Sequence, residues 1–177
     1  MEKNPPTNSQ ILRVAVISDS HLEDPSEWFS TLYGRHLAEA DVLLHCGDIT
    51  GWQVLHFLDA HPRFHAVAGN MDTHLYHAGL PGKLELELNG LRVGIAHGWG
   101  FGYELAREVV ASFGPGFDLV FFGHTHIYEC TRFGNTTALN PGSCRAPRGG
   151  TEPSFALVTL GPERSLAVER IVLPRKW

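Results

Sequence analysis

Cysteine is scarce in this sequence. The three cysteines, Cys46, Cys130 and Cys144, lie far apart, and no two of them form a C-x-x-C pair. This spacing argues against a disulfide framework and against a zinc site made of thiolates. Cys46 lies within an apolar stretch, so we expect it to be a small buried side chain.

Long hydrophobic runs and an excess of basic residues are also missing. No apolar run approaches the length that crosses a bilayer, and the polar first ten residues do not fit a signal peptide. The net charge of -5 argues against a protein that binds nucleic-acid polymers through a basic face. We therefore expect a cytoplasmic protein with no membrane attachment, whose residues 1–11 form a loose tail.

The rest of the composition is typical of a globular protein. Hydrophobic residues make up 43% of the 177 residues and charged residues 19%. A chain of this length has enough apolar material for one packed core. No internal repeat or linker divides it, so we predict a single domain over residues 1–177.

Apolar periodicity predicts strands that alternate with helices in the first part of the chain and mostly short antiparallel strands afterwards. The predicted helices begin near residue 25, at 52 with Thr50 as N-cap, and at 103, and residues 73–82 are predicted as a loop. Asn89-Gly90 predicts a tight hairpin. The predicted strands are 13–18, 42–46, 64–68, 84–88, 91–96, 119–122, 155–160, 167–172 and two short ones around Cys130 and Thr137. This mixture predicts an α/β protein with two packed sheets flanked by helices.

The stretch from Leu119 to His126 is the most informative in the chain. Four apolar residues predict a buried strand, and a glycine and two histidines, His124 and His126, follow it. If the backbone stays extended there, both imidazoles leave it on the same side. A pair of surface histidines in a turn is the simpler interpretation when the stretch is taken alone.

Four other apolar runs end in the same way, on side chains that can bind a metal. Ligands in α/β sheets bind at the carboxyl ends of strands, where the loops converge. Each residue alone has a structural explanation: an aspartate can cap a helix, and an asparagine can adopt a left-handed turn. Seven such residues at five strand ends favour a metal site over chance. They are Asp19, His21, Asp48, Asn70, His97, His124 and His126.

The predicted ligand set indicates the chemistry. Two carboxylates, one amide oxygen and four imidazoles, with no thiolate, suit Mn²⁺, Fe, Zn²⁺, Ni²⁺ or Co²⁺. Seven ligands are too many for one tetrahedral ion but suit two ions that share a carboxylate. Two ions about 3.5–4 Å apart can clamp the attacking and leaving oxygens of an in-line phosphoryl displacement. A hydroxide bridging them is a nucleophile at neutral pH.

The ordered motifs resemble those of the calcineurin-like metallophosphoesterases. They are D-S-H at 19–21, G-D at 47–48, G-N-x-D at 69–72, H-G at 97–98 and G-H-T-H at 123–126. The short length and the segment N-P-G-S at 140–143 look like the small YfcE-type phosphodiesterase branch. The resemblance implies a four-layer αββα sandwich and hydrolysis of phosphodiesters, frequently with Mn²⁺.

Carried over by position, the resemblance implies two metal sites that share Asp48. One would consist of Asp19, His21, Asp48 and His126, and the other of Asp48, Asn70, His97 and His124. Asp48, Asn70 and His97 are also predicted to be catalytic residues. His74 and Arg145 are predicted to face a small phosphoester substrate.

One residue departs from the pattern of many relatives. They have a histidine after the asparagine, which is thought to protonate the leaving group, whereas this chain has Met71. A thioether cannot donate a proton, so substrates with poor leaving groups are expected to react slowly.

Two other functions remain open at this stage. A protein-interaction scaffold on the same fold, similar to the retromer subunit that has lost ligands and activity, is one alternative. A phosphomonoesterase is the other, and a homo-oligomer is compatible with each. The complete ligand set favours the enzyme over the scaffold.

Overall fold

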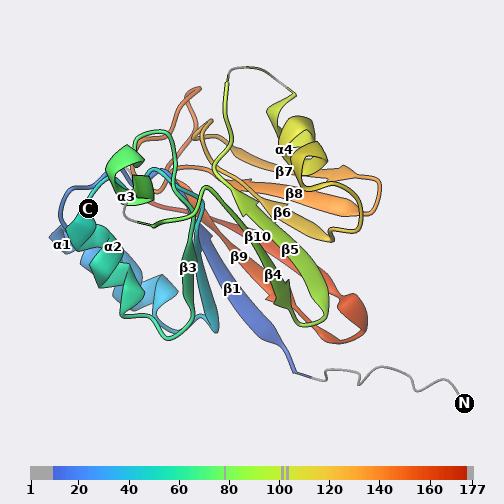
Figure 1. The fold of residues 1–177 in the computed structure, drawn as a ribbon. Coiled ribbons are helices and arrows are strands. Elements are labelled where there is room, and N and C mark those ends of the chain that lie inside the picture. The colour runs from blue at the N-terminus through green and yellow to red at the C-terminus, as the bar shows by residue number, and fades with distance from the viewer. Residues whose placement is uncertain (1–9, 78, 101, 103, 175–177) are drawn as a thin grey trace, which may run out of the picture.

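The computed structural model describes residues 10–174 except residues 78, 101 and 103. Most of the predicted N-terminal tail and the predicted helix start at Tyr103 therefore lie outside the described residues. Within them, ten strands form two mixed five-stranded sheets (Figure 1).

The first sheet has the strand order β10-β9-β1-β2-β3. Three neighbouring strands of this sheet are parallel to one another: β1 (Leu12–Ile17) at its centre, β2 (Val42–His45) beside it, and β3 (Phe64–Ala66) at the edge. The antiparallel strands β9 (Ser154–Leu160) and β10 (Leu166–Val172) complete it. The parallel strands therefore all end at the same edge of this sheet.

The second sheet has the order β4-β5-β6-β8-β7. Its strands are β4 (Lys83–Leu88), β5 (Leu91–Ala96), β6 (Leu119–Phe121), β7 (Tyr128–Phe133) and β8 (Thr136–Pro141). β5, β6 and β8 are parallel, while β4 and β7 pair antiparallel at the two edges. The carboxyl ends of β5 and β6 thus also lie together.

Alternate side chains of each strand pack on opposite faces of its sheet, as strand geometry requires. Val14 and Val16 of β1 belong to the core between the two sheets, whereas Ala15 and Ile17 pack under the helices. Those helices are α1 (Glu27–Leu32) with the π-helical segment Tyr33–Leu37, α2 (Trp52–Asp59) and α3 (Thr73–His77). Helix α4 (Leu105–Phe113) covers the second sheet through Val109 (Figure 1). The predicted four-layer αββα sandwich is confirmed.

Most predicted elements are present, with three local differences. The hairpin at Asn89-Gly90 is confirmed, with φ of 51° and 76° at the two residues. The N-cap of α2 is Gly51 rather than Thr50, because Thr50 has a φ of 72° and no side-chain cap bond is formed. Residues 73–77, predicted as loop, form α3, whose Leu75 is fully buried. Strands β1, β2, β3 and β6 also end one or two residues earlier than predicted.

None of the helices in the described ranges is long and apolar enough to span a bilayer.

Candidate metal centre

The candidate site lies where the parallel strands of both sheets end. The loop after β1 is tied to the loop after β2, because the Asp19 N–H donates to Gly47 O at 3.0 Å and the His21 N–H to Asp48 O at 3.1 Å. The loop after β6 is tied to the loop after β5 in the same way, because the Gly123 N–H donates to His97 O at 2.9 Å. The backbone therefore holds the ligand-bearing loops in fixed register.

The backbone at the predicted ligands is not extended. His124 and His126 have φ of 70° and 60°, and Asp19, His21 and Asp48 also adopt positive φ. Each such residue costs on the order of 1 kcal/mol, and such conformations cluster at functional sites. The assumption that the backbone is extended here is thus wrong. The two imidazoles belong to different ligand groups, described below.

Two glycines of the motifs, Gly69 and Gly123, lie where neighbouring loops approach each other too closely for any other residue. A Cβ on Gly69 would lie 2.1 Å from Asp48 Oδ1, and one on Gly123 would lie 2.0 Å from Ser18 Oγ. Any side chain at these positions would push the loops apart. The glycines before Asn70 and His124 therefore let the loops from different strands approach closely.

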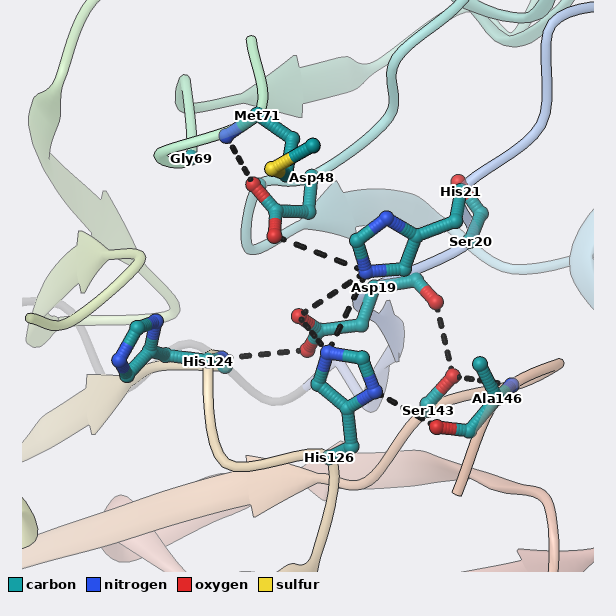
Figure 2. A network of polar contacts seen from close by, with 12 residues as sticks. Asp19, Ser20, His21, Asp48, Gly69, Met71, His124, His126, Ser143 and Ala146 are labelled. Carbon is teal, nitrogen blue, oxygen red and sulfur yellow. Dashed lines mark hydrogen bonds and ion pairs between the residues drawn. The ribbon is translucent and has the colours of Figure 1, made fainter. Parts of the chain in front are cut away.

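The first ligand group consists of Asp19, His21, Asp48 and His126 (Figure 2). One ligand atom from each of these four side chains lies within 4.8 Å of the others. His126 Nε2 is 3.1 Å from Asp19 Oδ1 and 3.2 Å from His21 Nε2. Asp48 Oδ2 is 3.6 Å from His21 Nε2. The structure thus brings together the first set of ligands that the resemblance implies.

The second ligand group consists of Asp48, Asn70, His97 and His124. Asn70 Oδ1 lies 3.2 Å from His97 Nε2 and 3.0 Å from His124 Nδ1. His97 Nε2 lies 3.4 Å from Asp48 Oδ2. The same oxygen of Asp48 therefore faces both groups, an arrangement that suits a bridging carboxylate.

The histidine tautomers fit a cation in both groups. His97 Nδ1 is 2.8 Å from Cys46 O and His126 Nδ1 is 2.6 Å from Ala146 O. A carbonyl only accepts, so each Nδ1 carries the proton and the neutral ring presents a lone pair at Nε2. For His124 the roles are exchanged, because its Nε2 donates to Gly100 O at 2.7 Å and Nδ1 faces Asn70. Histidines that bind metals are oriented in this way by their second nitrogen.

The carboxylates at the centre also require positive charge. Asp19 is fully buried, and its Oδ1 accepts no hydrogen bond from the described residues. Burial acts to raise the pKa of Asp19, but His126 and His97 outweigh it and hold the pKa below its ordinary value. Burial likewise opposes the ionisation of Asp48, whose pKa is nevertheless lowered, chiefly by His97.

His97 responds in the opposite direction. Burial acts to lower its pKa, but Asp48 and Asp19 raise it above the ordinary value. The buried carboxylates therefore favour a positive charge beside them, which a proton on His97 or a divalent cation can supply. The residues present fit the group of metals that the sequence implies.

The N-P-G-S segment supports the first ligand group, a role that the sequence alone did not reveal. The Ser143 hydroxyl donates to Asp19 O at 2.7 Å and accepts the Ala146 N–H at 2.7 Å. Ala146 O in turn orients His126 (Figure 2). Asn140 Nδ2 donates to Gly123 O at 2.6 Å and so fixes the loop after β6. The motif was visible in the sequence, but only the fold shows that it meets Asp19.

Asp72, the last residue of G-N-x-D, is a second supporting residue. Its carboxylate is fully buried and accepts the backbone N–H groups of Ile49, Thr50 and Gly69 at 3.1, 2.8 and 2.9 Å. It thereby joins the loop that carries Asp48 to the loop that carries Asn70. Because both oxygens accept hydrogen bonds, Asp72 is not placed to protonate a leaving group.

We expect Asp72→Ala to lower the free energy of unfolding by about 2–4 kcal/mol, because three backbone donors lose a charged acceptor. Urea denaturation monitored by circular dichroism measures this change. Asp59→Ala, which removes an exposed carboxylate of α2, is the control and should change stability little. Equal effects of the two substitutions would contradict a role for Asp72 in joining the loops.

Two histidines outside the ligand groups are buried. His45 accepts the Gly47 N–H at Nδ1, and its Nε2 lies 3.0 Å from Ser20 Oγ. Burial lowers its pKa to about 4, so it is neutral at pH 7. His61 is also buried, and its Nε2 lies 3.0 Å from Ala40 O.

The predicted substrate-facing residues lie at the surface. Arg145 is exposed, and its guanidinium donates to His21 O, next to the first ligand group. His74 is exposed on α3, with its ring centroid 6.2 Å from that of Trp52. Met71 is 55% exposed, and its N–H donates to Asp48 Oδ1 at 2.8 Å (Figure 2).

Comparisons with known proteins agree with this geometry. A family model described as the calcineurin-like phosphoesterase superfamily domain matches residues 12–162. A probable metallophosphoesterase of Methanocaldococcus jannaschii is 33% identical over 138 residues, which cover 76% of this chain and 69% of that protein.

Solved structures show the same fold. The YfcE phosphoesterase of E. coli matches with a TM-score of 0.62 at 21% identity, over 92% of this chain and 100% of that chain. Vps29 of Entamoeba histolytica, crystallised with zinc, matches with a TM-score of 0.63 at 25% identity, over 91% of this chain and 99% of that chain.

Proposed function

The chain belongs to the calcineurin-like phosphoesterase superfamily, and from this premise we propose that it is a dinuclear metal-dependent phosphodiesterase. The observation that carries the proposal is the position of Asp48, whose Oδ2 faces His21 of the first ligand group and His97 of the second. A single-metal site needs no such shared oxygen. The proposed substrate is a small phosphodiester.

We propose Mn²⁺ as the metal, with Fe, Ni, Zn and Co as alternatives, because nitrogen and oxygen ligands without thiolate suit these ions. When bound, two divalent cations stabilise the developing charge on a phosphoryl group and acidify water. The chain's own contribution is to hold the imidazole and carboxylate lone pairs in place. Asp48, Asn70 and His97 would do so from the loops after β2, β3 and β5.

Arg145 is proposed to bind the anionic phosphoester at the rim. A guanidinium has five N–H donors, and contact with His21 O leaves others for phosphate oxygens. The exposed His74 is proposed to face the substrate from α3. The global charge of -5 does not oppose this binding, because bound cations are the largest local charges in such a site.

The proposal predicts about two transition-metal ions per chain after loading with Mn²⁺. Elemental analysis measures the ratio, and bis(4-nitrophenyl) phosphate measures diester hydrolysis in the same samples. Chelation should stop hydrolysis, and adding Mn²⁺ back should restore it. Full activity with a single ion per chain would contradict the dinuclear site.

The same samples test the other two functions. A higher kcat/KM for 4-nitrophenyl phosphate than for the diester would indicate a phosphomonoesterase. Failure to cleave either ester at full metal loading would favour the interaction scaffold. We expect the diester to be the better substrate.

A further inference from the structure

Large apolar side chains are exposed on the loops that carry the second ligand group. Met71 follows Asn70 directly, and Trp99 lies two residues after His97. Met71 is 55% exposed and Trp99 is 44% exposed. Neither side chain contributes to the three apolar clusters of the core.

The backbone of Met71 is fixed against the metal centre. Its N–H donates to Asp48 Oδ1 at 2.8 Å, and Figure 2 shows the residue beside Asp48. The amide of the preceding Asn70 faces His97 and His124. The following Asp72 is turned inward to three backbone donors. Between these two polar residues, the loop presents a thioether to solvent.

Trp99 lies in a short segment that wraps His124. Gly100 O accepts from His124 Nε2 at 2.7 Å. On the other side of Trp99, a Cβ added to Gly98 would lie 3.3 Å from His124 Cβ. The backbone of Trp99 is thus flanked by two glycines that lie against a candidate ligand of the second group. Trp99 comes from the loop after β5, whereas Met71 comes from the loop after β3.

The cationic side chains of the rim belong to another segment. Arg145 donates to His21 O, and Arg148 Nη1 donates to His124 O at 3.3 Å. A phosphoester bound at the metals therefore has arginines from the loop after β8 to face its anionic oxygens. The loops after β3 and β5 offer it apolar surface for an ester group.

We propose that Met71 and Trp99 are specificity-determining residues that bind an aromatic ester group of the substrate. The inference rests on the proposed function and adds the substrate class. An indole face and a thioether both make favourable contacts with a flat ring. An aliphatic ester group has no flat aromatic face with which to make these contacts, so it gains less.

The test compares two diesters whose leaving groups have similar acidity, methyl phenyl phosphate and methyl hexafluoroisopropyl phosphate. With Mn²⁺-loaded protein we expect a KM several-fold lower for the phenyl ester. Trp99→Ala should reduce this preference by roughly 3- to 10-fold, which is the range of an aromatic contact. Met71→Ala should reduce it by about 3-fold. Trp99→Phe should retain most of it.

A binding measurement supplies a readout that does not depend on turnover. Calorimetry of the loaded protein should show tighter binding of phenylphosphonate than of methylphosphonate, with the difference reduced in Trp99→Ala. The control is Leu166→Ala, which removes an exposed apolar side chain from β10. Leu166 pairs with Leu160, which pairs with Leu12 at the start of β1, the end opposite the metal centre.

The outcomes separate this inference from the proposed function. Hydrolysis of both diesters with equal KM, unchanged by Trp99→Ala, would overturn the aromatic specificity and leave the phosphodiesterase intact. No hydrolysis and no binding of either phosphonate would overturn both. A preference lost equally in Leu166→Ala would also overturn the assignment, because the effect would not be local.

Discussion

Asp48→Asn is expected to reduce phosphodiester hydrolysis by about 10²–10⁴-fold, since several kcal/mol of charge stabilisation depends on correctly placed cations. The wild-type Oδ2 faces His21 Nε2 at 3.6 Å and His97 Nε2 at 3.4 Å. An asparagine can still accept the Met71 N–H through its amide oxygen. It then places an NH₂ group, which cannot bind a cation, where the shared oxygen stood.

Metal content distinguishes this effect from a loss of folding. Asp48→Asn should lower the ion count at both ligand groups, whereas His21→Ala removes a ligand of the first group alone and should cost less activity. Circular dichroism and elemental analysis are measured on the same preparations. Equal, mild losses in the two variants would mean that Asp48 does not bridge. A helix-cap role is already disfavoured, because α2 is capped at Gly51 without a side-chain bond.

The fold could be predicted well where local pattern and packing agree. The alternation of Leu84 to Leu88 and the pair Asn89-Gly90 determine a hairpin on their own, because strand period and turn chemistry are local. Helix α3 was missed for the opposite reason. Its five residues carry one buried apolar side chain, Leu75, and the helix depends on tertiary contact with the core under α1 and α2.

The clustering of the candidate ligands could be predicted, because parallel strands bring their carboxyl ends to one edge of a sheet. Strand order explains why Asp48 meets both groups: β2 lies beside β1, and the ends of β5 and β6 lie across the core between the sheets. The sequence contained the seven candidate ligands but did not show the backbone conformation that orients their side chains. No spacing rule describes the positive φ values at His124 and His126 or the close approach of Gly123 to Ser18.

The supporting residues were the hardest to predict. Ser143 reaches Asp19 across 124 residues of sequence, and Asp72 joins two loops through backbone donors. Backbone amides leave no signature in the sequence, so a residue that binds them is recognised only once the fold is known. The burial of His61 likewise depends on a backbone group, because its partner is the carbonyl of Ala40.

The second large effect concerns the leaving group. Wild-type kcat/KM is expected to fall steeply as the leaving group becomes less acidic, because general acid help is typically worth about 10²–10⁴-fold and neither Met71 nor Asp72 supplies a proton donor. Met71 is a thioether, and both oxygens of Asp72 accept backbone hydrogen bonds. His74 and His77 are exposed on α3, with rings beside Trp52 and Tyr76.

Met71→His should raise the rate for poor leaving groups by about 10²-fold, the lower end of the range for general acids, and change good ones little. The position tolerates the substitution, because the residue is 55% exposed and only its N–H bonds to Asp48. A series from 4-nitrophenyl to alkyl diesters at equal metal loading measures the slope. Met71→Gln is the matched control, since it is polar but cannot serve as an acid. Single-turnover kinetics measure the rate of the chemical step directly. If this rate does not depend on the leaving group in the wild type, another residue must supply the proton, and the absence of an acid is refuted.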